Sequence, residues 1–230
     1  MRVADLVGRY VELAITNWRL LLFLLPVAWL AFTVFGVLQE EVLGWSPADF
    51  ATLFDLDLIP VAFVTAATAQ AVLWGPSTGG VRQLIAVAGR AFPTMLAVTV
   101  LVRLAVVVGF LFLVLPAIAA AILFGLAAVI MMAERPAILA SLRQSFDMVL
   151  SAAVKVAASY VGYILSLVAI VFAMIIVAAA VAAMVPQPIS GHVTDGALAA
   201  ALSISHTVFA AGIYQVLTEA RQAQPSPSIN

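Results

Sequence analysis

Long apolar stretches alternate with short polar ones along this chain. No Asp, Glu, Lys or Arg lies within residues 104–133 or within residues 156–194. Both stretches exceed the roughly 20 apolar residues that a helix needs to cross a bilayer. Together with the helix breakers between them, the apolar windows predict six spans. The predicted spans are residues 18–38, 58–74, 94–115, 117–133, 156–185 and 197–217.

Three shorter segments precede the first, third and fifth spans, and each has apolar residues at helical spacing on one face and polar residues on the other. The first contains Leu6 and Tyr10, the second Leu84 and Phe92, and the third is residues 138–150. Each is predicted to be an amphipathic helix on the cytoplasmic side, followed by a hairpin of two spans. We interpret this as a threefold helix-hairpin repeat, a type of symmetry common in transport folds. The alternative is three unrelated helices lying in the membrane interface.

The amino-acid composition also indicates that the chain is surrounded by lipid. Hydrophobic residues make up 65% of the chain and charged residues 9%, against roughly 25% charged residues in soluble domains. The predicted fold class is therefore all-α integral membrane, with one polytopic domain over residues 1–218 and a disordered cytoplasmic tail over residues 219–230. The first apolar run lacks a convincing cleavage site, which favours an uncleaved span over a signal peptide.

The placement of charge predicts the orientation. Six spans put every Lys and Arg except Arg103 on one side, and the acidic Glu40, Glu41 and Asp57 on the other. Cytoplasmic loops are enriched in Lys and Arg, so both termini are predicted to be cytoplasmic. Lipid headgroups on that side account for the bases without a nucleic acid partner. On the opposite side, residues 45–54 predict a short interfacial helix anchored by aromatic side chains.

One stretch resembles a known family. The sequence runs LVLPAI at residues 113–118, then an apolar span that ends at Glu134, then ASLRQSFDMVL at residues 140–150. This order resembles the membrane domain found ahead of some glycerophosphoryl diester phosphodiesterases and the related YciC-type inner-membrane proteins. The matching positions are Pro116, Glu134, Arg143, Ser145 and Phe146, while Ala117 replaces a usual glycine and Phe146 a common tryptophan.

The resemblance implies a multi-pass protein of the bacterial inner membrane in an envelope-related or lipid-related setting, without an established reaction. In the family the phosphodiesterase chemistry belongs to a separate soluble domain. The residues after the last predicted span are too few to form such a domain, so we expect it to be absent.

Polar residues inside apolar windows are candidate ligand contacts. By analogy with Lys155 in the next repeat, we expect Arg103 to extend to the cytoplasmic interface, with contact to an anion or lipid phosphate as the alternative. His206 lies near the middle of the sixth span. We expect it to make an interhelical hydrogen bond, to Gln70 or Gln215, rather than to relay protons, because no span offers a carboxylate.

The junction after the fourth span is another candidate site. Glu134 and Arg135 close that span, and Arg143 and Asp147 follow in the next helix. We expect these charges to pair structurally. The alternative is that the junction, including Ser145 of the family motif, binds lipid headgroups.

Signals for other chemistry are weak. The chain has no cysteine, no Gly-rich phosphate loop and no nucleophile elbow. His192 and Asp195 share a predicted outer loop but lack the further ligands of a zinc site, and Asp55 and Asp57 fit a solvated acidic loop. We therefore predict no metal, no cofactor and no enzymatic activity.

Three functions are compatible with these features. The favoured hypothesis is a non-enzymatic membrane protein that supports envelope or membrane-lipid homeostasis through contacts with lipids or partner proteins. A transporter or lipid-translocating protein is the alternative, and a membrane-embedded enzyme ranks third. Small residues at four-residue spacing allow close helix packing, and with it a homo-oligomer.

Overall fold

The computed structural model describes residues 2–44, 56–75, 80–112, 114–186 and 189–223, and every regular element in these ranges is helical. The elements in chain order are α1 (Val3–Thr16), α2 (Trp18–Val37), the π-helical turn η1 (Leu38–Val42), α3 (Leu58–Trp74), α4 (Gly80–Phe112), α5 (Val114–Phe124), α6 (Ala127–Glu134), α7 (Ile138–Leu150), α8 (Ala153–Ala182) and α9 (Ile189–Gln222). The predicted all-α class is thus confirmed. The predicted interfacial helix at 45–54 lies outside the described residues.

Within the described ranges, five helical segments are long and apolar enough to cross a membrane. They are Trp18–Val42, Val81–Phe112, Pro116–Glu134, Ala153–Ala182 and Ile189–Gln222. The remaining predicted span, the second in chain order, is α3, which is apolar but has only 17 residues. At 1.5 Å per residue it is about 25 Å long, slightly less than the roughly 30 Å hydrocarbon core of a bilayer. The multi-pass membrane character is therefore supported, and the sixth pass stays a prediction.

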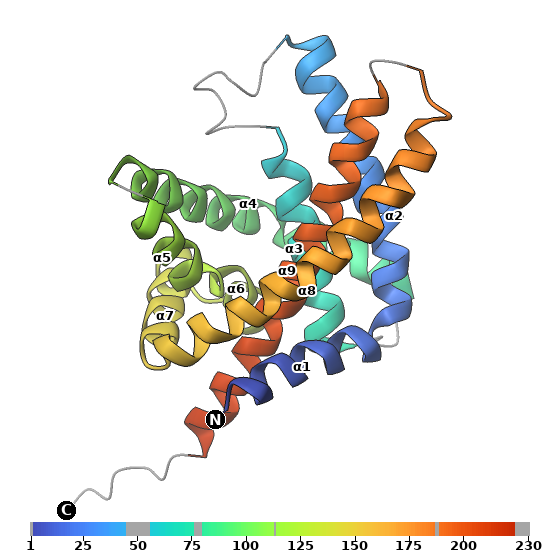
Figure 1. The fold of residues 1–230 in the computed structure, drawn as a ribbon. Coiled ribbons are helices and arrows are strands. Elements are labelled where there is room, and N and C mark those ends of the chain that lie inside the picture. Colours follow the sequence, from blue (N-terminus) through green and yellow to red (C-terminus); the bar gives the residue numbers. More distant parts are fainter. Residues whose placement is uncertain (1, 45–55, 76–79, 113, 187–188, 224–230) are drawn as a thin grey trace, which may run out of the picture.

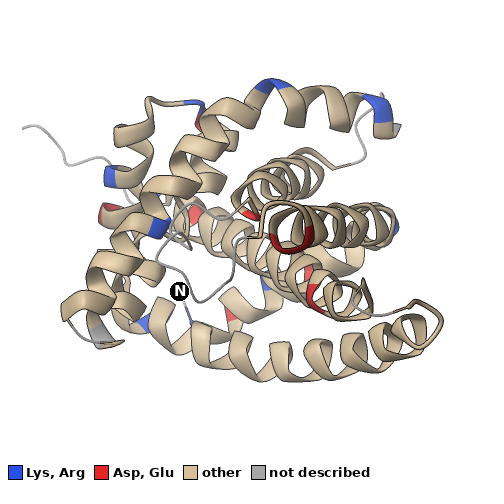
Figure 2. Cartoon of the chain, turned by 90° about the horizontal axis from the view of Figure 1, so that it is seen from above, with Lys and Arg blue, Asp and Glu red and all other residues tan. Residues whose placement is uncertain are grey.

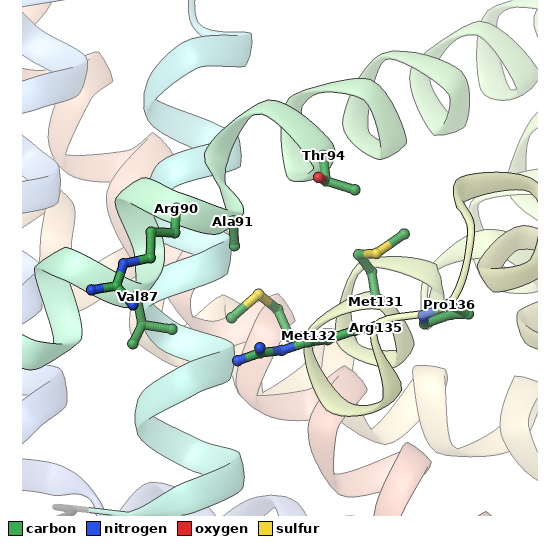
Figure 3. A pocket seen from close by; sticks show the side chains of 8 residues that line it. All are labelled: Val87, Arg90, Ala91, Thr94, Met131, Met132, Arg135 and Pro136. Atoms are coloured by element: carbon green, nitrogen blue, oxygen red, sulfur yellow. The ribbon is translucent and has the colours of Figure 1, made fainter.

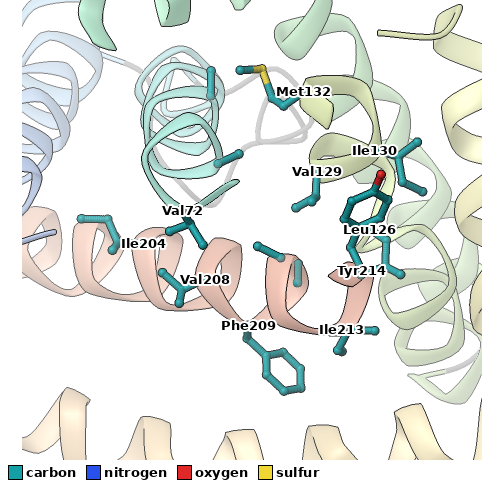
Figure 4. Packing of buried hydrophobic residues seen from close by; sticks show 14 of the residues in the cluster. Val72, Leu126, Val129, Ile130, Met132, Ile204, Val208, Phe209, Ile213 and Tyr214 are labelled. Carbon is teal, nitrogen blue, oxygen red and sulfur yellow. The ribbon is translucent and has the colours of Figure 1, made fainter. Parts of the chain in front are cut away.

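Helix α9 forms the centre of the bundle. It packs against α1, α2, α3 and α8 and runs through the middle of the molecule in Figure 1 (red). Its buried Ile204 and Val208 face Val72 of α3 in Figure 4. The start of α1 and the end of α9 lie at the same end of the bundle, where Arg9 forms an ion pair with Glu219.

Apolar side chains also cover much of the outside. Exposed large hydrophobic residues occur along α2, α4, α5 and α8. Between Lys155 and its end, α8 carries no charged residue, as Figure 2 shows. A helix that carries apolar side chains on every face, many of them exposed, is suited to a lipid environment.

The three predicted amphipathic helices are all helical, and each buries its apolar face. Leu6 of α1, Leu84 of α4 and Val149 of α7 are buried. Their neighbours differ, however: α1 packs on α8 and α9, α4 on α3 and α5, and α7 on α5 and α6. The threefold repeat accordingly stays a prediction.

Several predicted boundaries are wrong. The second amphipathic segment and the third span form one helix, α4, with Pro93 inside it. Proline removes one backbone hydrogen bond and clashes with the preceding turn, and α4 changes direction between Ala91 and Thr94 (Figure 3). The fourth span is divided at Gly125 into α5 and α6. The sixth begins two turns earlier than predicted and continues to Gln222.

Candidate functional site

A cavity of about 290 Å³ lies among α3, α4, α5, α6, α8 and α9, and we call it the central cavity. Most of its wall is aliphatic. Its lining also includes six side chains with polar atoms, namely Thr65, Thr99, Arg103, Tyr160, His206 and Thr207. Two of the residues selected from the sequence, Arg103 and His206, are thus brought together from different helices.

Arg103 is not where the sequence interpretation put it. Its Nη1 donates to Oδ1 of Asp57 at 2.9 Å, and Asp57 immediately precedes α3, at the opposite end of that helix from Trp74. Because α3 and α4 run antiparallel, residue 103 reaches the level where α3 begins rather than the end where α4 begins. The analogy with Lys155 fails because α4 continues unbroken from Gly80 through Pro93.

Tyr160 supplies a hydroxyl to the cavity wall. The Oη atom is buried and has no hydrogen-bond partner among the described residues. Gly125, at the break between α5 and α6, makes room for this hydroxyl, since an added Cβ there would lie 2.8 Å from Tyr160 Oη. The Tyr160 ring is held edge-on against Phe209 of α9, with centroids 4.9 Å apart. This packing fixes the orientation of the ring.

His206 contacts aromatic rings. Its ring lies 6.4 Å from that of Tyr160 and 6.1 Å from that of Tyr163. The hydrogen bonds of the described residues include none from His206 to Gln70 or Gln215, so that expectation is wrong. Gln70 is half-buried on α3 and does not line the central cavity.

Two of the three threonines that line the cavity bond to their own helices. Thr99 Oγ1 donates to the Met95 carbonyl and Thr207 Oγ1 to the Ser203 carbonyl, both at 2.8 Å. Because their hydroxyl hydrogens are used in this way, the two threonine side chains offer the cavity methyl groups and acceptor lone pairs but no free hydrogen-bond donor. The result is an apolar chamber with a guanidinium-carboxylate pair at one end, one phenolic hydroxyl and one imidazole. It can enclose an apolar chain and offer a few hydrogen bonds to a polar group attached to it.

The family-like segment has a structural role. Ser145 is fully buried, and its Oγ donates to the Leu123 carbonyl at 2.7 Å, which ties α7 to the end of α5. The Phe146 ring lies 6.3 Å from that of Phe124. Arg143 is exposed and forms no ion pair with the described residues.

The sequence predicted that the charged residues at this junction pair with one another, and the structure shows other partners for Glu134. Glu134 accepts hydrogen bonds from Gln144 Nε2 at 2.8 Å and from Tyr214 Oη at 2.9 Å. No ion pair to Arg143 or Arg135 is formed in the described part of the chain. The carboxylate is thus used to join α6, α7 and α9.

A second cavity, of about 320 Å³, lies between the bend of α4 and the end of α6, and we call it the arginine pocket. Arg90, Thr94 and Arg135 are its polar residues, and Met131 and Met132 form part of its floor (Figure 3). The central cavity lies about one helical turn further along the same two helices, at Val98 of α4 and Ala128 of α6. Both cavities are therefore lined by consecutive turns of α4 and α6.

Acidic side chains gather at the far end of the bundle, where Glu40, Asp57, Asp195 and His192 line a smaller cavity. His192 Nε2 lies 3.5 Å from Glu41 Oε1, and His192 belongs to the first turn of α9 rather than to a loop. Among the described residues, no group of three or more His, Cys, Asp or Glu is arranged to hold a metal ion.

Sequence reasoning missed Tyr160 and the pairing of Arg90 with Arg135. Two tyrosines three residues apart, at 160 and 163, near the start of an otherwise aliphatic span were an available signal. The arginine pair had none, because its members are 45 residues apart. Comparisons with models of protein families, with curated proteins and with solved structures found no match to this chain.

Proposed function

We propose that this chain is a non-enzymatic, multi-pass protein of the bacterial inner membrane that binds membrane lipids and so supports envelope or membrane-lipid homeostasis. In this proposal the chain crosses six times, with α3 as a short second pass and both termini in the cytoplasm. Affiliation with the YciC-type proteins belongs to the proposal and stands on the motif from Pro116 to Phe146 alone.

The central cavity is the observation that carries the proposal. Its aliphatic wall suits an acyl chain, and the helices around it are apolar on their outer faces as well, so a lipid can approach from the bilayer. In this proposal the Tyr160 hydroxyl, which is buried and has no partner among the described residues, donates to a lipid ester oxygen. Leaving a buried hydroxyl without a partner costs about 1–3 kcal/mol, and a bound ester would recover part of that cost.

Lipid translocation is the second candidate function. It is favoured by the position of the arginine pocket and the central cavity on consecutive turns of α4 and α6. A translocator would need the two to become continuous during its cycle. Reconstituted liposomes with fluorescent phospholipids distinguish the candidates: a translocator makes inner-leaflet lipid accessible to dithionite within minutes, whereas a lipid-binding protein does not.

Native mass spectrometry of the detergent-extracted protein tests lipid binding. We expect the wild-type chain to retain lipid. Ala128→Phe and Ala121→Phe place a ring in the central cavity from two different helices, and both should lose the bound lipid. Ala119→Phe, on the exposed face of α5, is the matched control and should retain it.

Two results would contradict the proposal. One is equal lipid retention by both cavity-filling variants, provided that their melting temperatures show them to be folded. The other is a lipid-free wild-type protein that emerges with a soluble protein bound in a one-to-one ratio, which would favour a scaffolding role.

A further inference from the structure

The arginine pocket combines two cations from distant parts of the sequence. Arg90 lies on the last turn of α4 before Pro93, and Arg135 immediately follows α6. Figure 3 shows the Arg135 side chain extending past Met132 toward the segment of α4 that carries Val87 and Arg90. Both side chains line one cavity of about 320 Å³.

Nothing in the pocket neutralises these charges. Arg90 and Arg135 form no ion pair with the described residues, and no acidic residue lines the cavity. The adjacent Glu134 is occupied by Gln144 and Tyr214. Two guanidinium groups with only Thr94 beside them as a further polar side chain favour a multiply charged oxyanion, because guanidinium donates two parallel hydrogen bonds to phosphoryl oxygens.

The backbone at Arg135 is unusual. It is the one non-glycine residue of the described chain with a positive φ, at φ 52° and ψ 41°. This left-handed position after a helix is usually filled by glycine, and a side chain there costs roughly 1–2 kcal/mol. Pro136 follows and restricts the residue before it still further. Such strain is typical of positions whose side chain is needed for function. We therefore infer that an arginine stands at this position because it binds a ligand, and not because the fold requires it.

The remaining wall of the pocket identifies the source of the anion. Val87, Ala91, Met131 and Met132 are apolar, and Met side chains adapt to irregular apolar ligands. A free phosphate ion would gain nothing from these groups. A lipid would place its phosphoryl group between the arginines and its glycerol and first methylenes on the apolar floor.

We propose that the arginine pocket is a binding site for the phosphoryl group of an anionic membrane phospholipid. This site is separate from the central cavity. The inference goes beyond the proposed function because it specifies the class of headgroup that is bound and the two residues that bind it. Arg90 and Arg135 hold the phosphoryl oxygens, and the net charge of the pair selects an anionic headgroup over a zwitterionic one.

Thermal unfolding of the full-length protein in detergent, with added lipid, tests the site. Dioleoylphosphatidylglycerol should raise the melting temperature of the wild type in a saturable way, and dioleoylphosphatidylcholine should raise it much less. Each of Arg90→Gln and Arg135→Gln should increase the half-saturating concentration of phosphatidylglycerol at least about ten-fold, the effect of one lost charged hydrogen bond. Arg82→Gln, an exposed arginine on the same helix, is the control and should behave as wild type.

A second variant separates ligand binding from folding. Arg135→Gly removes both the charge and the backbone strain, so its lipid-free melting temperature should equal or exceed that of the wild type while the response to phosphatidylglycerol is lost. An unchanged phosphatidylglycerol response in the Arg90→Gln/Arg135→Gln double variant would overturn the proposal. Saturable stabilisation by millimolar inorganic phosphate that depends on both arginines would overturn the lipid assignment.

The same samples distinguish this inference from the proposed function. Filling the central cavity with Ala128→Phe should reduce retention of lipids with every headgroup, whereas the arginine variants should remove only the preference for anionic lipid. If Ala128→Phe reduces lipid retention but the arginine variants keep the preference for anionic lipid, the phosphoryl site is rejected and the proposed function stands.

Discussion

A close crossing of α2 and α9 makes a sharp prediction at Gly196. A Cβ added there would lie 2.8 Å from the backbone nitrogen and 3.1 Å from the Cα of Thr33, so alanine would force α2 and α9 apart. Overpacking of this kind costs about 1–3 kcal/mol, and alanine returns about 0.5–1 kcal/mol through its higher helix propensity. Gly196→Ala should therefore lower the free energy of unfolding by about 1–2 kcal/mol.

The measurement is thermal unfolding in detergent, followed by tryptophan fluorescence. A loss of 1–2 kcal/mol corresponds to a fall in melting temperature of roughly 2–8 °C for a chain of this size. Gly191→Ala is the control on the same helix, because a Cβ there has no neighbour within 4 Å, and it should be neutral or slightly stabilising. Equal shifts in the two variants would refute the claim that a close crossing requires the glycine.

Five further substitutions, at four residues, test individual contacts by the same assay. Tyr160→Phe should raise the free energy of unfolding by up to about 1–3 kcal/mol, because it removes a buried hydroxyl that has no partner among the described residues. Tyr10→Phe should lower it by about 1 kcal/mol, because it breaks a 3.1 Å hydrogen bond to α9. The reverse order would show that the Tyr160 hydroxyl is bonded. Ser145→Ala should cost about 1 kcal/mol through the lost bond to α5, and Ser145→Thr should not restore it if the fully buried site lacks room for a methyl group. Arg103→Gln should cost only about 0.5–1 kcal/mol, because the ion-pair side chains of Arg103 and Asp57 are 30% and 46% exposed, and a much larger loss would mean that the pair is shielded from water.

The length of each apolar run was sufficient to predict most of the helices. The segment at 58–74 was predicted to the residue, because Asp57 and Gly75 flank it and both interrupt an apolar run. The amphipathic segments were equally readable, since alternating polar and apolar faces are a local property of the sequence. These signals arise from residues a few positions apart, so no knowledge of the tertiary structure was needed.

Tertiary structure alone decided how those helices meet. In a membrane protein the lipid-facing and the packed sides of a helix are both apolar, so periodicity does not reveal which side is inside. The partner of Arg103 lies 46 residues away, and its depth depends on α4 continuing through Pro93. The joint placement of Arg90 and Arg135 likewise depends on the bend of α4 and the left-handed turn after α6. The composition of the chain thus determined that its helices are apolar enough to span a membrane, and only the packing of these helices decided which of its few polar groups share a cavity.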